Sequence, residues 1–186
     1  MPPKVFALLT QFGGDNFIIL LAQTRFFVSY DHMIRESTDQ IDKLLLTALQ
    51  ADASLSQRDL AEKIGLSQNA CWRRLKTLRE SGIIKGSTAR LDREKLGLGL
   101  VVFMMIRTRH HSTDWLKTFR RHVSNLPEVV DFFRIGGDYD YMLKVVTHDM
   151  ASYDSVYQRL IERVELDSVT SYFAMEAIEE QRPIPL

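Results

Sequence analysis

Apolar positions follow a helical spacing over residues 37–94 of this chain. The first stretch repeats its apolar residues at i, i+3, i+4, i+7 and i+8, as one face of an α-helix does. Those residues are Ile41, Leu44, Leu45, Ala48 and Leu49. Ser37 and Gln40 stand before them in the order of a capping box, so we expect the helix to begin there.

Two shorter helical segments follow, and a very short connection joins them. Ser56, with Asp59 three residues later, is a typical helix start, and Gly65 can take the left-handed conformation that ends a helix. Ser67 then caps a further helix, which Gly82 ends. The expected inward residues are Leu60, Ala61 and Ile64 in the first segment and Cys71, Leu75 and Leu78 in the second. Two helices joined this tightly predict a helix-turn-helix.

The outward face of the helix after Ser67 carries groups that can bind nucleic acid. At 100° per residue, the face opposite Cys71 presents Asn69, Arg73, Lys76 and Thr77. These side-chain types hydrogen-bond base edges and phosphates in a major groove. Trp72 lies on the border, where it either packs on the edge of the first helix or touches the sugar-phosphate backbone.

A stretch over residues 83–91 resembles a short hairpin suited to a wing. It holds Lys85 and follows the basic helix directly. A basic cluster alone would more often be a solvated helix face, but this position after a tight helix-turn-helix favours DNA binding.

The second half of the chain alternates strand-like and helix-like segments. Strands are expected over residues 100–108, 129–135, 141–146 and 169–175, and helices over 115–123 and 150–164. The order βαββαβ predicts a ferredoxin-like antiparallel sheet with both helices on one face. Both faces of the first strand are apolar, so the uncovered face needs a partner, and the simplest partner is a second copy of the sheet.

Composition describes a soluble globular chain of 186 residues with one cysteine and 45% hydrophobic residues. One cysteine fits a reducing cytoplasm, and no apolar run approaches the roughly 18 residues that a membrane span needs. Cys71 lies on the apolar side of its helix and is expected to be a small buried hydrophobe.

Net charge is zero, with 24 basic and 24 acidic residues, which by itself argues against nucleic-acid binding. The charge is unevenly spread, however. Residues 67–90 hold six basic residues and one acidic residue, whereas residues 95–186 hold 11 basic and 13 acidic ones. The local excess coincides with the predicted recognition helix and wing.

Residues 1–36 differ from the rest of the chain. They are rich in aromatic residues, poor in charge and unlike a secretory signal, and Met33 stands shortly before the first patterned helix. We interpret them as an atypical extension outside the functional unit, which an upstream start codon would explain. The alternative is a real extension that packs its aromatic side chains on a neighbour.

One turn in the second half could hold a small ligand. Gly136 and Gly137 allow close approach to backbone amides, and Asp138 and Asp140 could meet an ammonium group. Taken alone, such a turn is usually only a hairpin connection.

These motifs together resemble the Lrp/AsnC (feast/famine) family of regulators. The motifs are SQRDLAEKIGLSQNACWRRLKTLRESGIIKG, RIGGDYDYMLKV and the tail SYFAMEAIEEQRPIPL, in the family's order, and the likeness runs from about residue 37 to the end. It implies an α+β chain with a winged helix-turn-helix over 37–93, a hinge over 94–99, a RAM domain over 100–178 that binds an effector and forms oligomers, and a tail over 179–186.

The resemblance also implies the site residues. For DNA they are Ser67, Gln68, Asn69, Trp72, Arg73, Arg74, Lys76 and Lys85. For an amino-acid effector they are Gly136, Gly137, Asp138, Tyr139 and Asp140, with Thr170 and Ser171 as weaker candidates. Expected partners are double-stranded DNA and further copies of the chain, as a homodimer that assembles into a tetramer or octamer. No cofactor or metal is expected.

The sequence therefore predicts a sequence-specific transcriptional regulator that responds to an amino acid bound between dimers, and not an enzyme. One alternative is a nucleoid-type architectural DNA binder of low specificity. The other is a small-molecule enzyme on the ferredoxin-like domain, suggested by His110, His111, His122 and His148, which lack the spaced companions of a catalytic or metal site.

Overall fold

The computed structural model describes residues 38–186, which divide into two compact units. One unit holds the described residues up to Thr88 together with Gln181–Leu186, and the other is Ala89–Glu180. The interpretation of residues 1–36 and of Ser37 lies outside the described residues, and the expected segment boundaries stay predictions.

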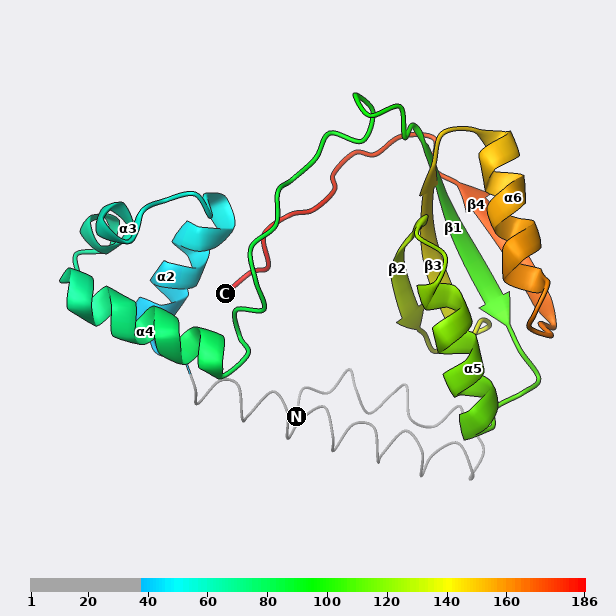
Figure 1. Ribbon diagram of the computed structural model, residues 1–186, viewed down its shortest axis with the longest axis horizontal. Coiled ribbons are helices and arrows are strands. Elements are labelled where there is room, and N and C mark those ends of the chain that lie inside the picture. The colour runs from blue at the N-terminus through cyan, green and yellow to red at the C-terminus, as the bar shows by residue number, and fades with distance from the viewer. Residues whose placement is uncertain (1–37) are drawn as a thin grey trace, which may run out of the picture. The chain divides into compact units, whose positions relative to one another are not determined.

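Three helices form the first unit, in which α2 (Gln40–Ala51), α3 (Gln57–Lys63) and α4 (Gln68–Glu80) follow one another (Figure 1). Their inward side chains make one core. It consists of Leu45, Ala48, Leu60, Ala61, Cys71 and Leu75. Burial of these apolar groups is what fixes three short helices that would be marginal alone.

The start of α2 differs from the expected capping box at Ser37 and Gln40. Asp39 is the N-cap: its Oδ1 accepts the backbone N–H of Asp42 at 2.8 Å, and the Asp42 carboxylate accepts the N–H of Asp39 at 3.2 Å. Two carboxylates can close the same reciprocal box as Ser and Gln, and they also favour the positive end of the helix. The expected cap was therefore wrong by two residues.

The caps predicted for the next two helices are confirmed. Ser56 accepts the backbone N–H of Asp59, and Ser67 accepts that of Ala70 at 3.3 Å. Gly65 lies at φ +72°, a conformation that a side chain would strain, and this lets α4 begin three residues later.

No hairpin forms over residues 83–91, where one was expected. Within the described residues this stretch contains no strand, and its side chains from Lys85 to Leu91 are exposed. The N–H of Ile84 donates to the Leu78 carbonyl at 3.0 Å, which holds the start of this stretch against α4. A hairpin needs a buried face to hold it, and here only Ile83 and Ile84 are partly buried, while the residues from Lys85 to Leu91 are exposed.

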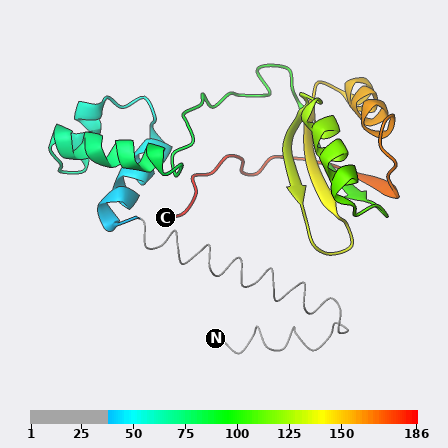
Figure 2. The same cartoon turned by 60° about the horizontal axis from the view of Figure 1, so that its bottom comes forward.

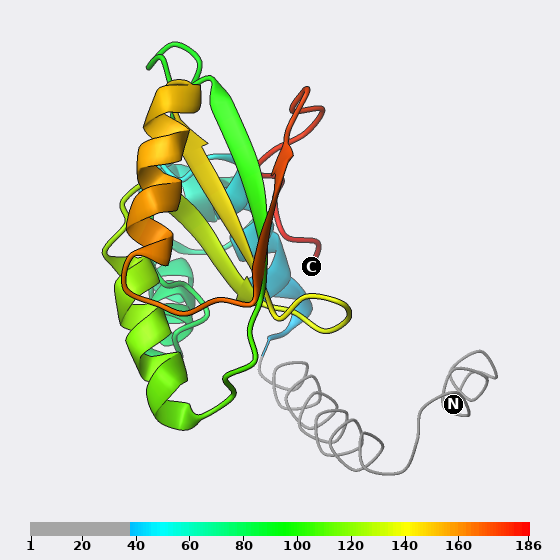
Figure 3. The ribbon, with the colours of Figure 1, turned by 90° about the vertical axis from the view of Figure 1, so that its right-hand side faces the viewer.

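The second unit has the predicted order. It contains β1 (Leu100–Arg107), α5 (Thr113–Ser124), β2 (Val129–Arg134), β3 (Tyr141–Thr147), α6 (Met150–Ile161) and β4 (Ser168–Phe173). All strand pairs are antiparallel, in the order β2-β3-β1-β4. Figure 2 shows the hairpin of β2 and β3 with its turn, and Figure 3 shows both helices on one face of the sheet.

The two faces of the sheet differ in cover. Met104 of β1 is fully buried beneath the helices and pairs with Leu143 and Ser171. Its neighbours on the chain, Phe103 and Met105, lie on the other face and are only half-buried. We call that other face the open face.

The open face is not wholly apolar. Exposed Phe133 and Tyr172 lie on it, but Lys144 near its middle is ion-paired with Glu180 at 2.7 Å, and Arg93 contacts the same carboxylate at 3.1 Å. The apolar face expected from β1 therefore also carries this cluster of charged side chains. None of the helices within residues 38–186 is long and apolar enough to cross a membrane.

Candidate nucleic-acid interface and effector turn

The outward side of α4 presents four exposed polar side chains, which we call the recognition face. They are Asn69, Arg73, Lys76 and Thr77. Beneath them Cys71, Leu75 and Leu78 are buried, so the helix cannot rotate without exposing its core side. Burial raises the pKa of the Cys71 thiol, which keeps it neutral and unreactive.

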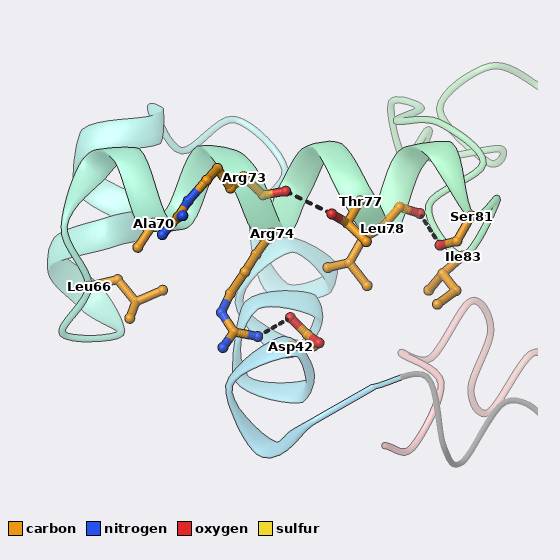
Figure 4. Close-up of a pocket in the computed structure, with 9 residues that line it drawn as sticks. All are labelled: Asp42, Leu66, Ala70, Arg73, Arg74, Thr77, Leu78, Ser81 and Ile83. Atoms are coloured by element: carbon orange, nitrogen blue, oxygen red, sulfur yellow. Dashed lines mark hydrogen bonds and ion pairs between the residues drawn. The ribbon is translucent and has the colours of Figure 1, made fainter.

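Arg73 is the cation on this face that is free to bind. Its side chain makes no hydrogen bond or ion pair with another residue of the described chain; only its carbonyl is used, accepting the Thr77 hydroxyl at 3.1 Å (Figure 4). Lys76 is engaged weakly, at 3.8 Å from Glu80 on the same exposed surface. Such a surface pair contributes little to stability.

Arg74 points the other way, towards α2. Its Nη1 donates to Asp39 at 2.7 Å and to Asp42 at 2.9 Å (Figure 4). The backbone N–H of Asp42 and then Arg74 hold the pKa of Asp39 below its ordinary value. The structure therefore places Arg74 as a clamp between α4 and α2, away from the recognition face.

A groove of about 500 Å³ runs along one flank of α4. Arg73, Arg74 and Thr77 stand along one side, and Leu66 and Ile83 contribute apolar lining (Figure 4). The groove adjoins the recognition face, but of its two guanidinium groups only that of Arg73 is unpaired, since Arg74 is bonded to Asp42, which also lines the groove.

The other predicted DNA residues lie around the same helix. Ser67 caps its start, and the carbonyl of Gln68 accepts the Gln57 amide at 3.1 Å, which fastens α3 to α4. Trp72 is 50% exposed with the Lys76 ammonium 5.3 Å from its ring centre, so it faces outward. Lys85 is exposed on the stretch after α4.

The turn between β2 and β3 is tied to β1 by its last residue. Asp140 Oδ2 accepts the backbone N–H of Thr108 at 2.8 Å, so this carboxylate is already used. Asp138 is exposed, and its carboxylate makes no bond to another described residue. Gly137 lies at φ +122°, where a side chain would be strained. We call residues 136–140 the effector turn.

Arg107, which sequence reasoning missed, belongs to this turn. Its Nε donates to the Asp138 carbonyl at 2.8 Å, and its guanidinium lies 5.6 Å from the Tyr139 ring centre. The sequence did contain a hint of this role, because an arginine ends an otherwise apolar strand. Only the order of strands in the sheet, however, brings the end of β1 beside the turn.

Thr170 and Ser171 lie on opposite faces of β4. The Thr170 hydroxyl accepts the Tyr139 hydroxyl at 3.4 Å, and the hydroxyls of Thr170 and Tyr172 lower the pKa of Tyr139. Ser171 instead bonds Tyr153 of α6 on the helix-covered face. The structure thus brings Thr170 to the effector turn and leaves Ser171 away from it.

The histidines are dispersed. His122 is held by the carbonyls of Arg159 and Leu160 at 2.9 and 3.0 Å, at the end of α6. His148 lies 2.9 Å from the Gly97 carbonyl, and His110 is 3.5 Å from Glu165. His110, His122 and His148 thus have separate neighbours, and the described residues contain no group of three or more His, Cys, Asp or Glu side chains placed to hold a metal ion.

Two family models match the chain. One, described as winged helix-turn-helix DNA-binding, matches residues 38–85, and the Lrp/AsnC ligand binding domain matches residues 101–184. The DNA-binding transcriptional activator DecR of Escherichia coli K12 is 46% identical over 149 residues, covering 80% of this chain and 98% of that protein. The glutamate uptake regulatory protein of Zymomonas mobilis is 44% identical over 154 residues, covering 83% and 93%.

Solved structures agree. The crystal structure of an AsnC family transcriptional regulator from Agrobacterium tumefaciens is 45% identical with a TM-score of 0.76, covering 80% of this chain and 97% of that one. A transcriptional regulator of Neisseria meningitidis in complex with L-Met is 30% identical with a TM-score of 0.74, covering 80% and 96%. These relatives are regulators and not enzymes. The chain belongs to the Lrp/AsnC family of DNA-binding transcriptional regulators.

Proposed function

We propose that α4 enters the major groove, where Gln68, Asn69 and Arg73 read base edges and Lys76 and Lys85 contact phosphates. The observation that carries this assignment is the free guanidinium of Arg73 on an exposed face whose opposite side is locked into the core. Amide and guanidinium groups are the side chains that pair with adenine and guanine edges. Phosphate contacts would supply much of the affinity and make it salt-dependent.

The test is a gel shift on the DNA upstream of the protein's own gene, with Arg73→Ala against wild type at one salt concentration. We expect affinity to fall roughly 5- to 150-fold, the equivalent of about 1 to 3 kcal/mol for a base contact. Arg163→Ala removes the same charge from an exposed position after α6 and serves as the matched control. Equal affinity of wild type and Arg73→Ala would overturn the assignment.

Random DNA in the same experiment separates a local regulator from an architectural binder. A regulator binds its own upstream DNA at least about a thousandfold more tightly than random DNA, whereas an architectural protein shows little preference.

We propose further that the open face joins two copies into a dimer, and that dimers assemble into a tetramer or octamer. The half-buried Phe103 and Met105 and the exposed Phe133 and Tyr172 support this, because large apolar side chains that reach solvent on one sheet face favour burial against a partner. Two copies of α4 would then reach half-sites about 34 to 36 Å apart. A DNA-bound regulator of this kind works in the cytoplasm.

The effector turn is proposed to bind an amino acid between dimers. The free Asp138 carboxylate suits the ammonium group, and Arg107 with the amides near Gly137 suits the carboxylate. The L-Met complex of the Neisseria relative supports the ligand class. Calorimetry with the twenty amino acids should find a binder that Asp138→Asn weakens; no binder in the panel would overturn this assignment.

A further inference from the structure

A cavity distinct from the groove along α4 lies in the sheet unit, between α5 and β2 on the helix-covered face. It measures about 270 Å³ and is lined by Arg120, Ser124, Phe132, Arg134 and Tyr141. Arg120 and Ser124 stand one turn apart on α5, and Phe132 and Arg134 are alternate residues of β2. Tyr141 of β3 pairs with Arg134 across the hairpin, so the lining comes from three elements, α5, β2 and β3.

Two guanidinium groups face this cavity without a partner. Neither Arg120 nor Arg134 forms an ion pair or side-chain hydrogen bond with another residue in the part of the chain that the structure describes. Burial raises the pKa of Tyr141, and Asp140 adds to that rise, while Arg134 and Arg120 oppose it. Both arginines are exposed, so water solvates them, and each guanidinium group keeps its donors available for an anion that enters the cavity.

The lining contains no carboxylate, and this restricts the anion. The nearby acid, Asp140, is used by the N–H of Thr108 at 2.8 Å. An amino acid would therefore leave its ammonium group without a partner here, in contrast to the effector turn with its free Asp138. The aromatic rings of Phe132 and Tyr141, whose centres lie 5.7 Å apart and whose planes are tilted by 56°, offer apolar contact beside the charges.

We propose that this cavity binds a small carboxylic acid that lacks an amino group, such as a 2-oxo acid. Its carboxylate lies between Arg120 and Arg134, and its apolar part lies against Phe132. Guanidinium groups suit planar carboxylates because they can donate two parallel hydrogen bonds. A cavity of this size, just below the usual range of about 300 to 1,000 Å³, favours a compact ligand.

The site would place two related ligands on one hairpin. Arg134 and Tyr141 flank the effector turn in sequence. A 2-oxo acid in the cavity and an amino acid at the turn would therefore both contact the β2–β3 hairpin, on opposite faces. The chain would thereby sense an amino acid and the product of its deamination separately. The proposal does not depend on the amino-acid assignment, because the two ligands are measured independently.

The experiment is calorimetry on the full chain with three matched pairs: pyruvate and alanine, 2-oxoisovalerate and valine, phenylpyruvate and phenylalanine. Inorganic phosphate is a further arm. We expect at least one oxo acid to bind, with affinity reduced tenfold or more by Arg120→Gln and by Arg134→Gln. Arg121→Gln, which removes the same charge from an exposed neighbour on α5, should leave it unchanged.

Several outcomes would overturn the proposal. The first is that no oxo acid binds. The second is that inorganic phosphate binds as tightly as each of the oxo acids. The third is that Arg121→Gln reduces the affinity for the oxo acid as much as Arg120→Gln and Arg134→Gln do. Loss of DNA affinity at fixed salt in Arg120→Gln and Arg134→Gln, without acid binding, would assign the pair to a DNA-contacting surface instead. Thermal unfolding of each variant confirms that the fold is kept, and Arg134→Lys, which keeps the charge but not the paired donors, should bind the acid more weakly than wild type.

Discussion

Arg73 and Arg74 are adjacent in the chain but act on different partners. Arg73 is exposed and unpaired, whereas Arg74 bridges Asp39 and Asp42 at the start of α2. Asp42 is a buried residue, so removing its cation would leave a carboxylate largely out of water. The two arginines should therefore separate DNA affinity from folding stability.

We expect Arg74→Ala to lower the free energy of unfolding by about 1 to 3 kcal/mol, the usual cost of losing a hydrogen-bonded charge partner. Arg73→Ala should change it by less than about 0.5 kcal/mol, as exposed substitutions do. Urea unfolding followed by circular dichroism measures both. Similar stabilities for the two variants would contradict the clamp.

The Asp39 cap predicts a dependence on pH. Its pKa in the folded chain lies below the ordinary value, because the N–H of Asp42 and Arg74 stabilise the carboxylate. The unfolded chain takes up the proton first as pH falls, so this stabilisation is complete above about pH 3.9 and is lost as pH falls through the folded pKa. Asp39→Asn should therefore flatten the acid limb of stability against pH.

The measurement is the midpoint of thermal unfolding from pH 7 down to pH 3. Asp154→Asn is the matched control, since it removes an exposed carboxylate on α6 that accepts no hydrogen bond from another described residue. An acid limb as steep in Asp39→Asn as in the control would show that the cap is not formed in solution.

At the scale of the element, α2 shows what periodicity can and cannot predict. Its spacing placed both Leu44 and Leu45 on the inward face, but Leu45 is fully buried and Leu44 is 48% exposed. Adjacent residues are 100° apart on a helix, so the edge of a face depends on the neighbour that it meets. Here the clamp with Arg74 turns Asp42 inward, and Leu44 lies outside the core.

Leu45→Ala should accordingly lower the free energy of unfolding by about 2 to 5 kcal/mol, through lost burial and a cavity in the helical core. Leu44→Ala makes the same chemical change at an exposed position and should cost less than about 1 kcal/mol. Chemical unfolding of the pair checks this, and equal costs would mean that Leu44 is covered in the protein as it exists in solution.

The caps of α3 and α4 and the βαββαβ order were predictable because both depend on local signals, whereas the cap of α2 lies at Asp39 and not at the expected Ser37. Ser56, Ser67 and Gly65 act on backbone groups within three residues, and strands and helices differ in period. The two faces of β4 were not predictable, because a shift of one residue in register reverses every side chain. Thr170 and Ser171 are adjacent, and only the pairing with Met105 and Met104 decides which reaches the effector turn.

Contacts between segments far apart in the chain could not be predicted from the sequence, for a related reason. Arg107 joins the effector turn across 31 residues, and Arg74 joins α2 across 35 and 32 residues. Nothing in the local pattern distinguishes these arginines from solvated ones. The family resemblance predicted Arg74 as a DNA-binding residue; it lies on α4, but the direction of its side chain depends on the packing of α2.

At the scale of the whole molecule, assembly and DNA binding should be linked. A single recognition helix contacts few bases. In a dimer, binding of the second helix becomes intramolecular once the first helix is bound, so the dimer binds DNA more tightly than the monomer. The open face would provide the dimer interface, and Met105 lies there on a central strand of the sheet. Loss of this interface should therefore weaken DNA binding even though α4 is unchanged.

We expect Met105→Glu to shift the chain towards monomers in sedimentation velocity at micromolar concentration, because a carboxylate in a joined apolar face would lose its water. Its affinity for the upstream DNA should fall at least tenfold, with the melting of the helix-turn-helix unit unchanged. Met150→Glu places the same charge at an exposed residue at the start of α6, outside the sheet, and should behave as wild type. If Met105→Glu sediments and binds DNA as the control does, the copies are joined elsewhere, and the open face must be covered by a different partner.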